Sequence, residues 1–170
     1  MESLKHQFFS HPMAKFGIRG LSRETGLDTK TVMKYLNQFM KRKLIIKRSE
    51  TGKYPYYEAN RNAFIYKHEK SEIIIKKIFE SGLIDYLQDK LSPNVIVLFG
   101  SVQKGTYHNS SDIDIFIQAP YKRINLSKFN KEMGHPIQLF FEKNLKNMSK
   151  GLLMNIYNGL TLTGKIEVLQ

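Results

Sequence analysis

The sequence predicts an α+β protein of two small domains, and three observations carry this prediction. A helical pattern followed by a strand–turn–strand pattern fills most of the first seventy residues. A continuous apolar run, NVIVLFG, and an alternating run, SDIDIFI, then predict strands of a buried sheet. The charge divides in the same way, because residues 1–70 hold 15 Lys+Arg against 6 Asp+Glu, whereas residues 71–170 hold 12 against 9. We therefore expect a boundary near residue 70, with domains at 1–70 and 71–170.

The composition limits the classes of function. The 170-residue chain is 41% hydrophobic and has a formal net charge of +12, which points to a polyanionic partner such as nucleic acid or a nucleotide. It has no cysteine, which excludes disulfides and cysteine-based zinc sites and favours a cytoplasmic location. We expect no signal peptide and no membrane partner, because the N-terminus lacks a long apolar core and no uninterrupted apolar window reaches about eighteen residues.

The segment FGIRGLSRETGLDTKTVMKYLNQFMKRKLI predicts two helices joined by a tight turn. The first covers about Arg19 to Thr25, and Gly26 ends it in a left-handed conformation. Asp28 then caps the second helix, from about Thr29 to Lys43, by accepting a hydrogen bond from an amide of its first turn. The apolar residues of this second helix share one face: Val32, Leu36, Phe39 and Met40.

A predicted β-hairpin follows, with strands at KLIIKRS and YPYYEAN around the turn ETGK. Two helices followed by a basic hairpin resemble the winged helix-turn-helix domains of archaeal and bacterial transcription factors, over about residues 4–60. The resemblance implies a second helix in the major groove of DNA and a wing along the phosphates. The DNA-binding residues that it implies are Thr29, Lys30, Lys34, Tyr35, Arg48 and Lys53. The alternative is a winged helix used only for protein contacts or dimerisation, with solvated lysines.

Residues 61–91 predict one or two helices, with a break at Gly82, and lead into the second domain. There NVIVLFG predicts a strand buried on both faces, ending in a Gly100-Ser101 turn. The alternation in SDIDIFI places Asp112 and Asp114 on one face, about 7 Å apart along the strand. Two such carboxylates repel unless a cation lies between them, and Mg²⁺ suits such a site because substrate phosphates complete its coordination. The glycine turn lets phosphates approach the backbone, and Lys104 adds a positive charge.

The motif Phe99-Gly100-Ser101, ten further residues and Asp112-Ile113-Asp114 resembles the nucleotidyltransferase superfamily, the fold family of DNA polymerase beta. Gly105 and Ser111 also match its minimal members, and the resemblance covers about residues 92–168. It implies a small nucleotidyltransferase-fold mixed sheet flanked by helices, which transfers NMP from a nucleoside triphosphate to an unknown acceptor. Asp112 and Asp114 are its implied catalytic and Mg²⁺-binding residues, and Gly100, Ser101 and Lys104 its implied nucleotide-binding residues. Some relatives act as antitoxins, which implies a toxin partner, and winged-helix domains commonly pair, which implies a homodimer.

One position departs from that family pattern. The resemblance implies a third carboxylate on a later strand, which active members usually carry, and in the candidate strand HPIQLFF, residues 135–141, that position holds Gln138. Glutamine is neutral and cannot act as a base. Glu142 shares its face by alternation, but it lies about 13 Å farther along the strand. Two hypotheses therefore stay open: an Mg²⁺-dependent nucleotidyltransferase, or a DNA-binding transcriptional regulator with an inactive nucleotide- or partner-binding domain.

Overall fold

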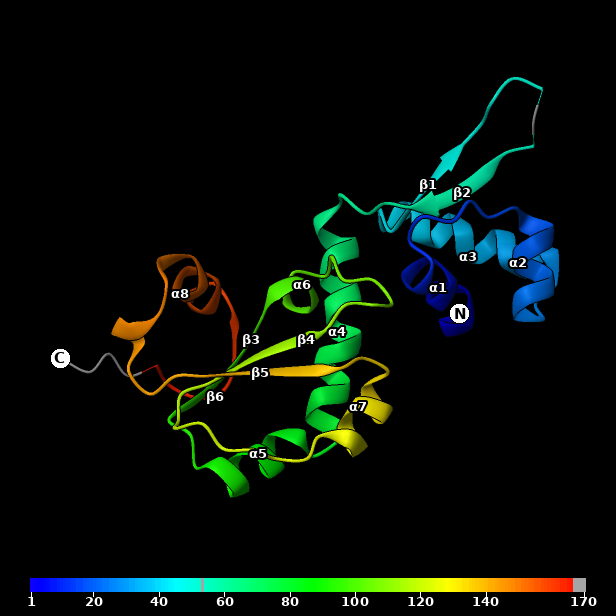
Figure 1. Cartoon of the computed structure of the whole chain (residues 1–170). Coiled ribbons are helices and arrows are strands. Elements are labelled where there is room, and N and C mark those ends of the chain that lie inside the picture. Colours follow the sequence, from blue (N-terminus) through cyan, green and yellow to red (C-terminus); the bar gives the residue numbers. More distant parts are fainter. Residues whose placement is uncertain (53, 167–170) are drawn as a thin grey trace. The chain divides into compact units, whose positions relative to one another are not determined.

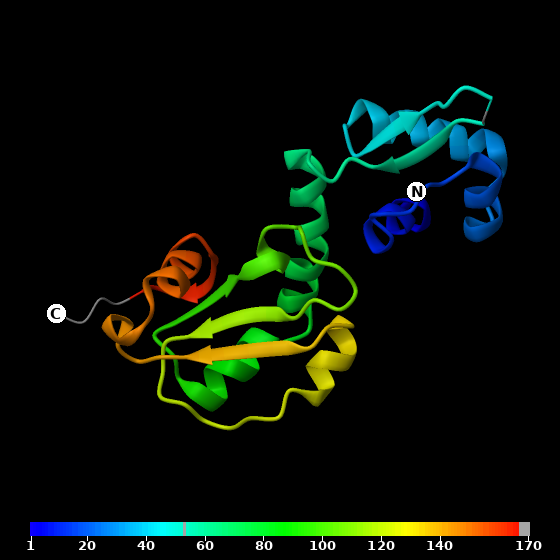
Figure 2. The same ribbon diagram turned by 45° about the horizontal axis from the view of Figure 1, so that its top comes forward.

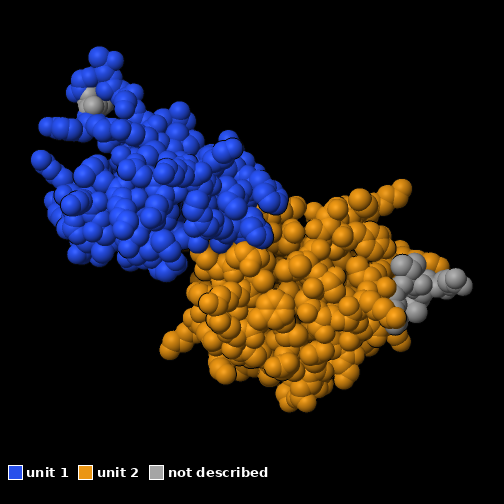
Figure 3. Space-filling model, turned by 180° about the vertical axis from the view of Figure 1, so that it is seen from behind, with its two compact units in different colours: residues 1–70 blue, residues 71–170 orange. Residues whose placement is uncertain are grey.

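The computed structural model of the chain describes residues 1–52 and 54–166. It divides into two compact units, Met1–Lys70 and Ser71–Gln170, which we call the N-terminal and C-terminal units (Figure 3). The division falls inside one helix, α4 (Phe64–Glu80). Within the described residues, no helix is long and apolar enough to cross a membrane.

The N-terminal unit consists of helices, a two-stranded hairpin and the first turns of α4 (Figure 1). Its other elements are α1 (Glu2–Ser10), α2 (Ile18–Thr25), α3 (Thr29–Lys41), β1 (Ile45–Arg48) and β2 (Tyr56–Ala59). β1 and β2 pair antiparallel, and Phe16 forms an isolated bridge with Tyr57 on the other side of β2. The helix–turn–helix and the hairpin therefore lie where the sequence predicts them.

The turn between α2 and α3 has the predicted chemistry. Gly26 ends α2 with φ of 70°, in the left-handed region. The Asp28 side chain caps α3 by accepting a hydrogen bond from the Thr31 amide at 2.9 Å. The helix ends at Lys41 rather than Lys43, because Lys43 adopts φ of 59° and turns the chain toward β1.

Helix α1 was not predicted from the sequence, although it supplies much of the core of this unit. Phe8 of α1 packs edge-on against Phe16, with ring centroids 4.9 Å apart. An ion-pair cluster joins α1 to the other helices, because Glu69 of α4 lies 2.6 Å from both Lys5 and Arg42. The buried apolar residues of α1 are Leu4, Phe8 and Phe9.

The C-terminal unit contains a four-stranded mixed sheet in the order β5-β4-β3-β6 (Figure 2). β4 and β5 are parallel, whereas β3 is antiparallel to both of its neighbours. This confirms the predicted mixed sheet flanked by helices. The elements after α4 are α5 (Leu83–Leu91), β3 (Val95–Phe99), α6 (Gly100–Gln103), β4 (Ile113–Ile117), α7 (Ser127–Met133), β5 (Ile137–Phe141), the 3₁₀-helix η1 (Leu145–Asn147), α8 (Lys150–Tyr157) and β6 (Leu160–Gly164).

The two faces of this sheet carry different hydrophobic clusters. Isoleucines 113, 115 and 117 of β4 pack with apolar residues of α4, α5 and α7. On the opposite face, Phe116 packs with Ile156 of α8 and Leu145 of η1. Because side chains alternate along a strand, Asp114 lies on the α8 face with Phe116. Every residue of β3 is buried, as predicted for a strand covered on both sides.

Candidate active site

The two aspartates of the predicted site lie at the start of β4. Asp112 is exposed and directly precedes the strand, and Asp114 is its half-buried second residue. Burial raises the pKa of the Asp114 carboxyl, and the negative charge of Asp112 raises that pKa further. A cation held by both carboxylates would relieve this repulsion.

The Gly100 turn lies against Asp114. Antiparallel pairing sets Phe99, the last residue of β3, opposite Asp114, and Gly100 follows with φ of 76°. A Cβ atom at Gly100 would collide with the Asp114 carboxylate, so both the backbone angle and the available space require glycine. The structure therefore brings the predicted turn and the predicted carboxylate together.

Ser101 and Lys104 lie on α6 and just after it. The Ser101 carbonyl accepts a hydrogen bond from the Thr106 amide at 2.9 Å, which folds the following loop back onto α6. Lys104 is exposed, and its Nζ donates to Asn155 Oδ1 of α8 at 3.3 Å. Gly105 is buried with φ of 66°, which explains in physical terms why glycine occurs at this position.

Gln138 lies beside Asp114. The parallel register pairs Asp114 of β4 with Gln138 of β5, and Gln138 is exposed. The structure therefore places Gln138 on the strand next to Asp114, and its correspondence to the third carboxylate of the family stays a prediction. Glu142 does not replace the missing carboxylate, because it follows β5 and its Oε1 accepts a hydrogen bond from the Asn144 amide at 2.9 Å.

The residues present fit a particular kind of metal site. Over residues 1–52 and 54–166, no group of three or more His, Cys, Asp or Glu side chains is placed to hold a metal ion. Two carboxylates remain, Asp112 and Asp114, with a neutral amide at Gln138. Such a set suits Mg²⁺, which commonly takes one or two carboxylates and completes its coordination with water and substrate phosphates.

The loop between α6 and β4 contains contacts that the sequence pattern does not reveal. His135 Nδ1 lies 2.9 Å from the carbonyl oxygen of Ser111, the residue before Asp112. Tyr107 is buried, and burial raises the pKa of its hydroxyl to about 12. The rings of Tyr107 and His135 meet edge-on, with centroids 5.4 Å apart. No local spacing signals these contacts, because His135 is distant in sequence from the loop that it touches.

The residues suggested for DNA binding lie in different surroundings. Thr29, Lys30 and Lys34 are exposed on α3, and Tyr35 is half-buried. Lys53 lies outside the residues that the structure describes. A groove of about 450 Å³ lies beside the start of α3, and its lining includes Arg19, Thr29, Met33 and Tyr54.

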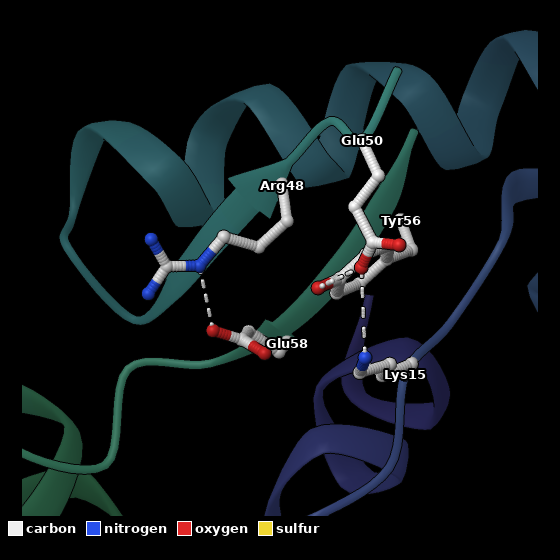
Figure 4. Close-up of polar contacts among 5 residues, drawn as sticks. All are labelled: Lys15, Arg48, Glu50, Tyr56 and Glu58. Carbon is white, nitrogen blue, oxygen red and sulfur yellow. Dashed lines mark hydrogen bonds and ion pairs between the residues drawn. The ribbon is translucent and has the colours of Figure 1, made fainter. Parts of the chain in front are cut away.

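Arg48 is paired within the hairpin. Its Nε donates to Glu58 Oε1 across the two strands at 2.8 Å (Figure 4). Nearby, Glu50 accepts a hydrogen bond from the Tyr56 hydroxyl at 3.2 Å and lies 3.8 Å from Lys15 Nζ. Because a guanidinium has five donors, Arg48 retains others for a phosphate, but Glu58 neutralises part of its charge.

Part of the C-terminal unit matches a known protein family. Residues 81–163 match the family model described as Polymerase beta, Nucleotidyltransferase. This segment runs from just before α5 into β6 and includes the Gly100 turn, both aspartates and Gln138. The match indicates a nucleotidyltransferase domain. No curated protein and no solved structure matches the chain.

Proposed function

We propose that the C-terminal unit binds a nucleoside triphosphate with Mg²⁺ and transfers its NMP group to an acceptor hydroxyl. One observation carries this proposal: a positive-φ glycine turn lies against a carboxylate whose pKa is raised, inside a segment that matches a nucleotidyltransferase family model. The acceptor would be a protein hydroxyl, an RNA end or a small molecule.

Each residue has a role in this proposal. Asp112 and Asp114 would hold Mg²⁺, which when bound neutralises charge on the phosphates. Gly100 lets the β- and γ-phosphates approach the backbone, where the first amides of α6 lack acceptors within the helix. Ser101 adds a hydroxyl, and Lys104 adds a positive charge. Catalysis then rests mainly on positioning and on charge neutralisation.

The transfer is a displacement at the α-phosphorus. The acceptor oxygen forms a bond to that phosphorus, the bond to the β-phosphate oxygen breaks, and pyrophosphate leaves with the electron pair. The hydroxyl proton goes to water, because the side chain beside Asp114 is the neutral amide of Gln138.

Gln138 also favours a second candidate function. Without a third carboxylate, the unit would bind nucleotide without turnover, and the whole chain would act as a DNA-binding regulator. The enzyme requires Mg²⁺-dependent nucleotide binding followed by transfer, whereas the regulator binds a nucleotide or a partner without transfer.

An assay with α-labelled nucleoside triphosphates separates the two candidates. The full-length protein is incubated with Mg²⁺ and candidate acceptors, beside an Asp112→Asn/Asp114→Asn control. Label transfer that the control lacks supports the enzyme, and magnesium-dependent binding in calorimetry without transfer to any acceptor supports the regulator. If no triphosphate binds with Mg²⁺, both nucleotide-dependent functions of this unit are wrong, and only a partner-binding domain is left.

For the N-terminal unit, we propose binding to duplex DNA through the exposed face of α3. Lys30 and Lys34 support this proposal, since residues four apart share one face of a helix and both are exposed. The excess of Lys and Arg in residues 1–70 supports it too. Gel shifts with duplex DNA at low salt test it, and an undetectable shift leaves the alternative of protein contacts or dimerisation.

A further inference from the structure

We propose that His135 is a positioning residue that holds the metal-binding carboxylate of Asp112 in place. This inference rests on the proposed function, because it assigns to His135 a part in Mg²⁺-dependent nucleotide binding. His135 itself would touch neither metal nor nucleotide. It acts through the backbone of Ser111.

Two hydrogen bonds bracket Asp112. On one side, His135 Nδ1 lies 2.9 Å from the Ser111 carbonyl oxygen. On the other side, the Ile113 amide donates to the Pro136 carbonyl at 2.8 Å. The neighbours of Asp112 on both sides are therefore tied to adjacent residues at the entry to β5. Asp112 is exposed and precedes the strand, so these ties locate its backbone before the β4 ladder begins.

The hydrogen bond to the Ser111 carbonyl determines that Nδ1 of His135 carries a hydrogen. A carbonyl oxygen only accepts, so Nδ1 must carry the hydrogen and donate it. The edge-on contact with Tyr107 restricts the orientation of the ring. A donor held in one direction resembles the outer groups that orient metal ligands in other sites, whose loss typically weakens metal affinity about 10- to 100-fold.

Ser111 also forms hydrogen bonds within its own loop, in addition to the one with His135. Its amide donates to the His108 carbonyl at 2.9 Å, and its Oγ accepts from the His108 amide at 3.0 Å. These bonds close the turn of residues 108–111 on itself but do not connect it to the sheet. The bond to His135 supplies that connection on the Ser111 side of Asp112, so losing it leaves only the Ile113–Pro136 bond to position the Asp112 backbone.

Two amide variants test the inference with closely matched side chains. His135→Asn places an NH₂ group near the position of Nδ1, whereas His135→Gln places it near Nε2, away from Ser111. Calorimetry of the full-length protein measures ATP binding as a function of Mg²⁺, and thermal melting confirms that each variant folds. Asn109→Ala, an exposed change in the same loop, is the control.

We expect the Gln variant to need about tenfold more Mg²⁺ for half-maximal ATP binding. The Asn variant should stay near the wild-type value, and the Asn109→Ala control should match the wild type. A purely structural role predicts equal effects of Asn and Gln, and that result, or two variants like the wild type, overturns the inference. If the wild type shows no Mg²⁺-dependent binding of ATP, the proposed function fails first and the inference fails with it.

Discussion

At the scale of single residues, the contact between Gly100 and Asp114 couples backbone conformation to the chemistry of the site. Gly100→Ala should cost about 1–2 kcal/mol of unfolding free energy from the left-handed backbone alone. It should also displace the Asp114 carboxylate, because the added Cβ collides with it. We therefore expect Mg²⁺-dependent nucleotide binding to weaken by more than the stability loss explains, measured by calorimetry on folded protein at low temperature.

Gly151→Ala is the matched control for this substitution. Gly151 lies in α8, and a Cβ there meets no atom within 4 Å. Alanine in a helix is favoured over glycine by up to about 1 kcal/mol, so this variant should melt higher and bind nucleotide normally. Equal nucleotide binding by the two variants would contradict the role given to the Gly100 turn.

Gln138 leads to a second prediction at this scale. Gln138→Asp introduces a carboxylate beside Asp114, at the position where the family resemblance predicts one. If the proton acceptor limits the reaction, label transfer should rise about 100-fold or more, within the range of general-base catalysis. Without Mg²⁺ the variant should have a lower melting temperature than the wild type, because three like charges then lie close together. Mg²⁺ with a triphosphate should reverse this decrease in melting temperature.

The neutral variant Gln138→Asn serves as the control for charge. It should not increase transfer, and the rise of its melting temperature with Mg²⁺ and a triphosphate should match that of the wild type. A wild-type protein that transfers label as fast as Gln138→Asp would show that the position does not limit the reaction.

At the scale of elements, the cap of α3 predicts a dependence on pH. Hydrogen bonds from the Thr31 side chain and amide hold the pKa of Asp28 below its ordinary value of 3.8. A carboxyl whose pKa is lowered by folding stabilises the protein above its unfolded pKa, and this contribution is lost as pH falls through the folded pKa. Asp28→Asn keeps a capping oxygen but cannot titrate. The advantage of the wild type over this variant in thermal melting should therefore begin to fall below about pH 4 and disappear once the pH is below the folded pKa, and a constant difference would contradict the assignment.

Strong local signals explain which elements the sequence predicts. Gly26 marks the end of α2, and Asp28 marks the start of α3. Gly82 separates α4 from α5, and the alternation at residues 112–117 predicts which side chains lie on each face of β4. Within the site, Gly100 and the two aspartates are likewise predicted from the sequence, because the spacing of the motif identifies them.

The elements and contacts that the sequence does not predict depend on tertiary structure. Helix α1 was not predicted because its apolar pattern is short. The contacts that bury its aromatic side chains, with Phe16 and Tyr66, form only in the folded unit. The 2.9 Å contact of His135 joins residues 24 apart, and the pairing of Arg48 with Glu58 requires the register of the hairpin. Periodicity reports which face of an element is buried, but it does not report which distant side chain lies there.

At the scale of the whole molecule, the charge is concentrated in one unit, and this yields a prediction about DNA. Glu58→Gln removes the partner of Arg48 and raises the net charge by one. If the hairpin lies along phosphates, duplex affinity should rise at low salt, and the slope of log affinity against log salt should steepen by about one.

The matched control for this prediction is Glu80→Gln, which releases Lys76 from an exposed ion pair in the C-terminal unit and changes the net charge equally. If net charge alone attracted DNA, the two variants would show the same gain and the same slope. We expect only Glu58→Gln to change both, because a counterion is released where a cation meets a phosphate and not elsewhere on the surface. Fluorescence anisotropy with one labelled duplex, from about 50 to 200 mM salt, measures both quantities. Identical slopes for the two variants would show that Arg48 does not contact DNA, and α3 would then be the candidate DNA-contacting element.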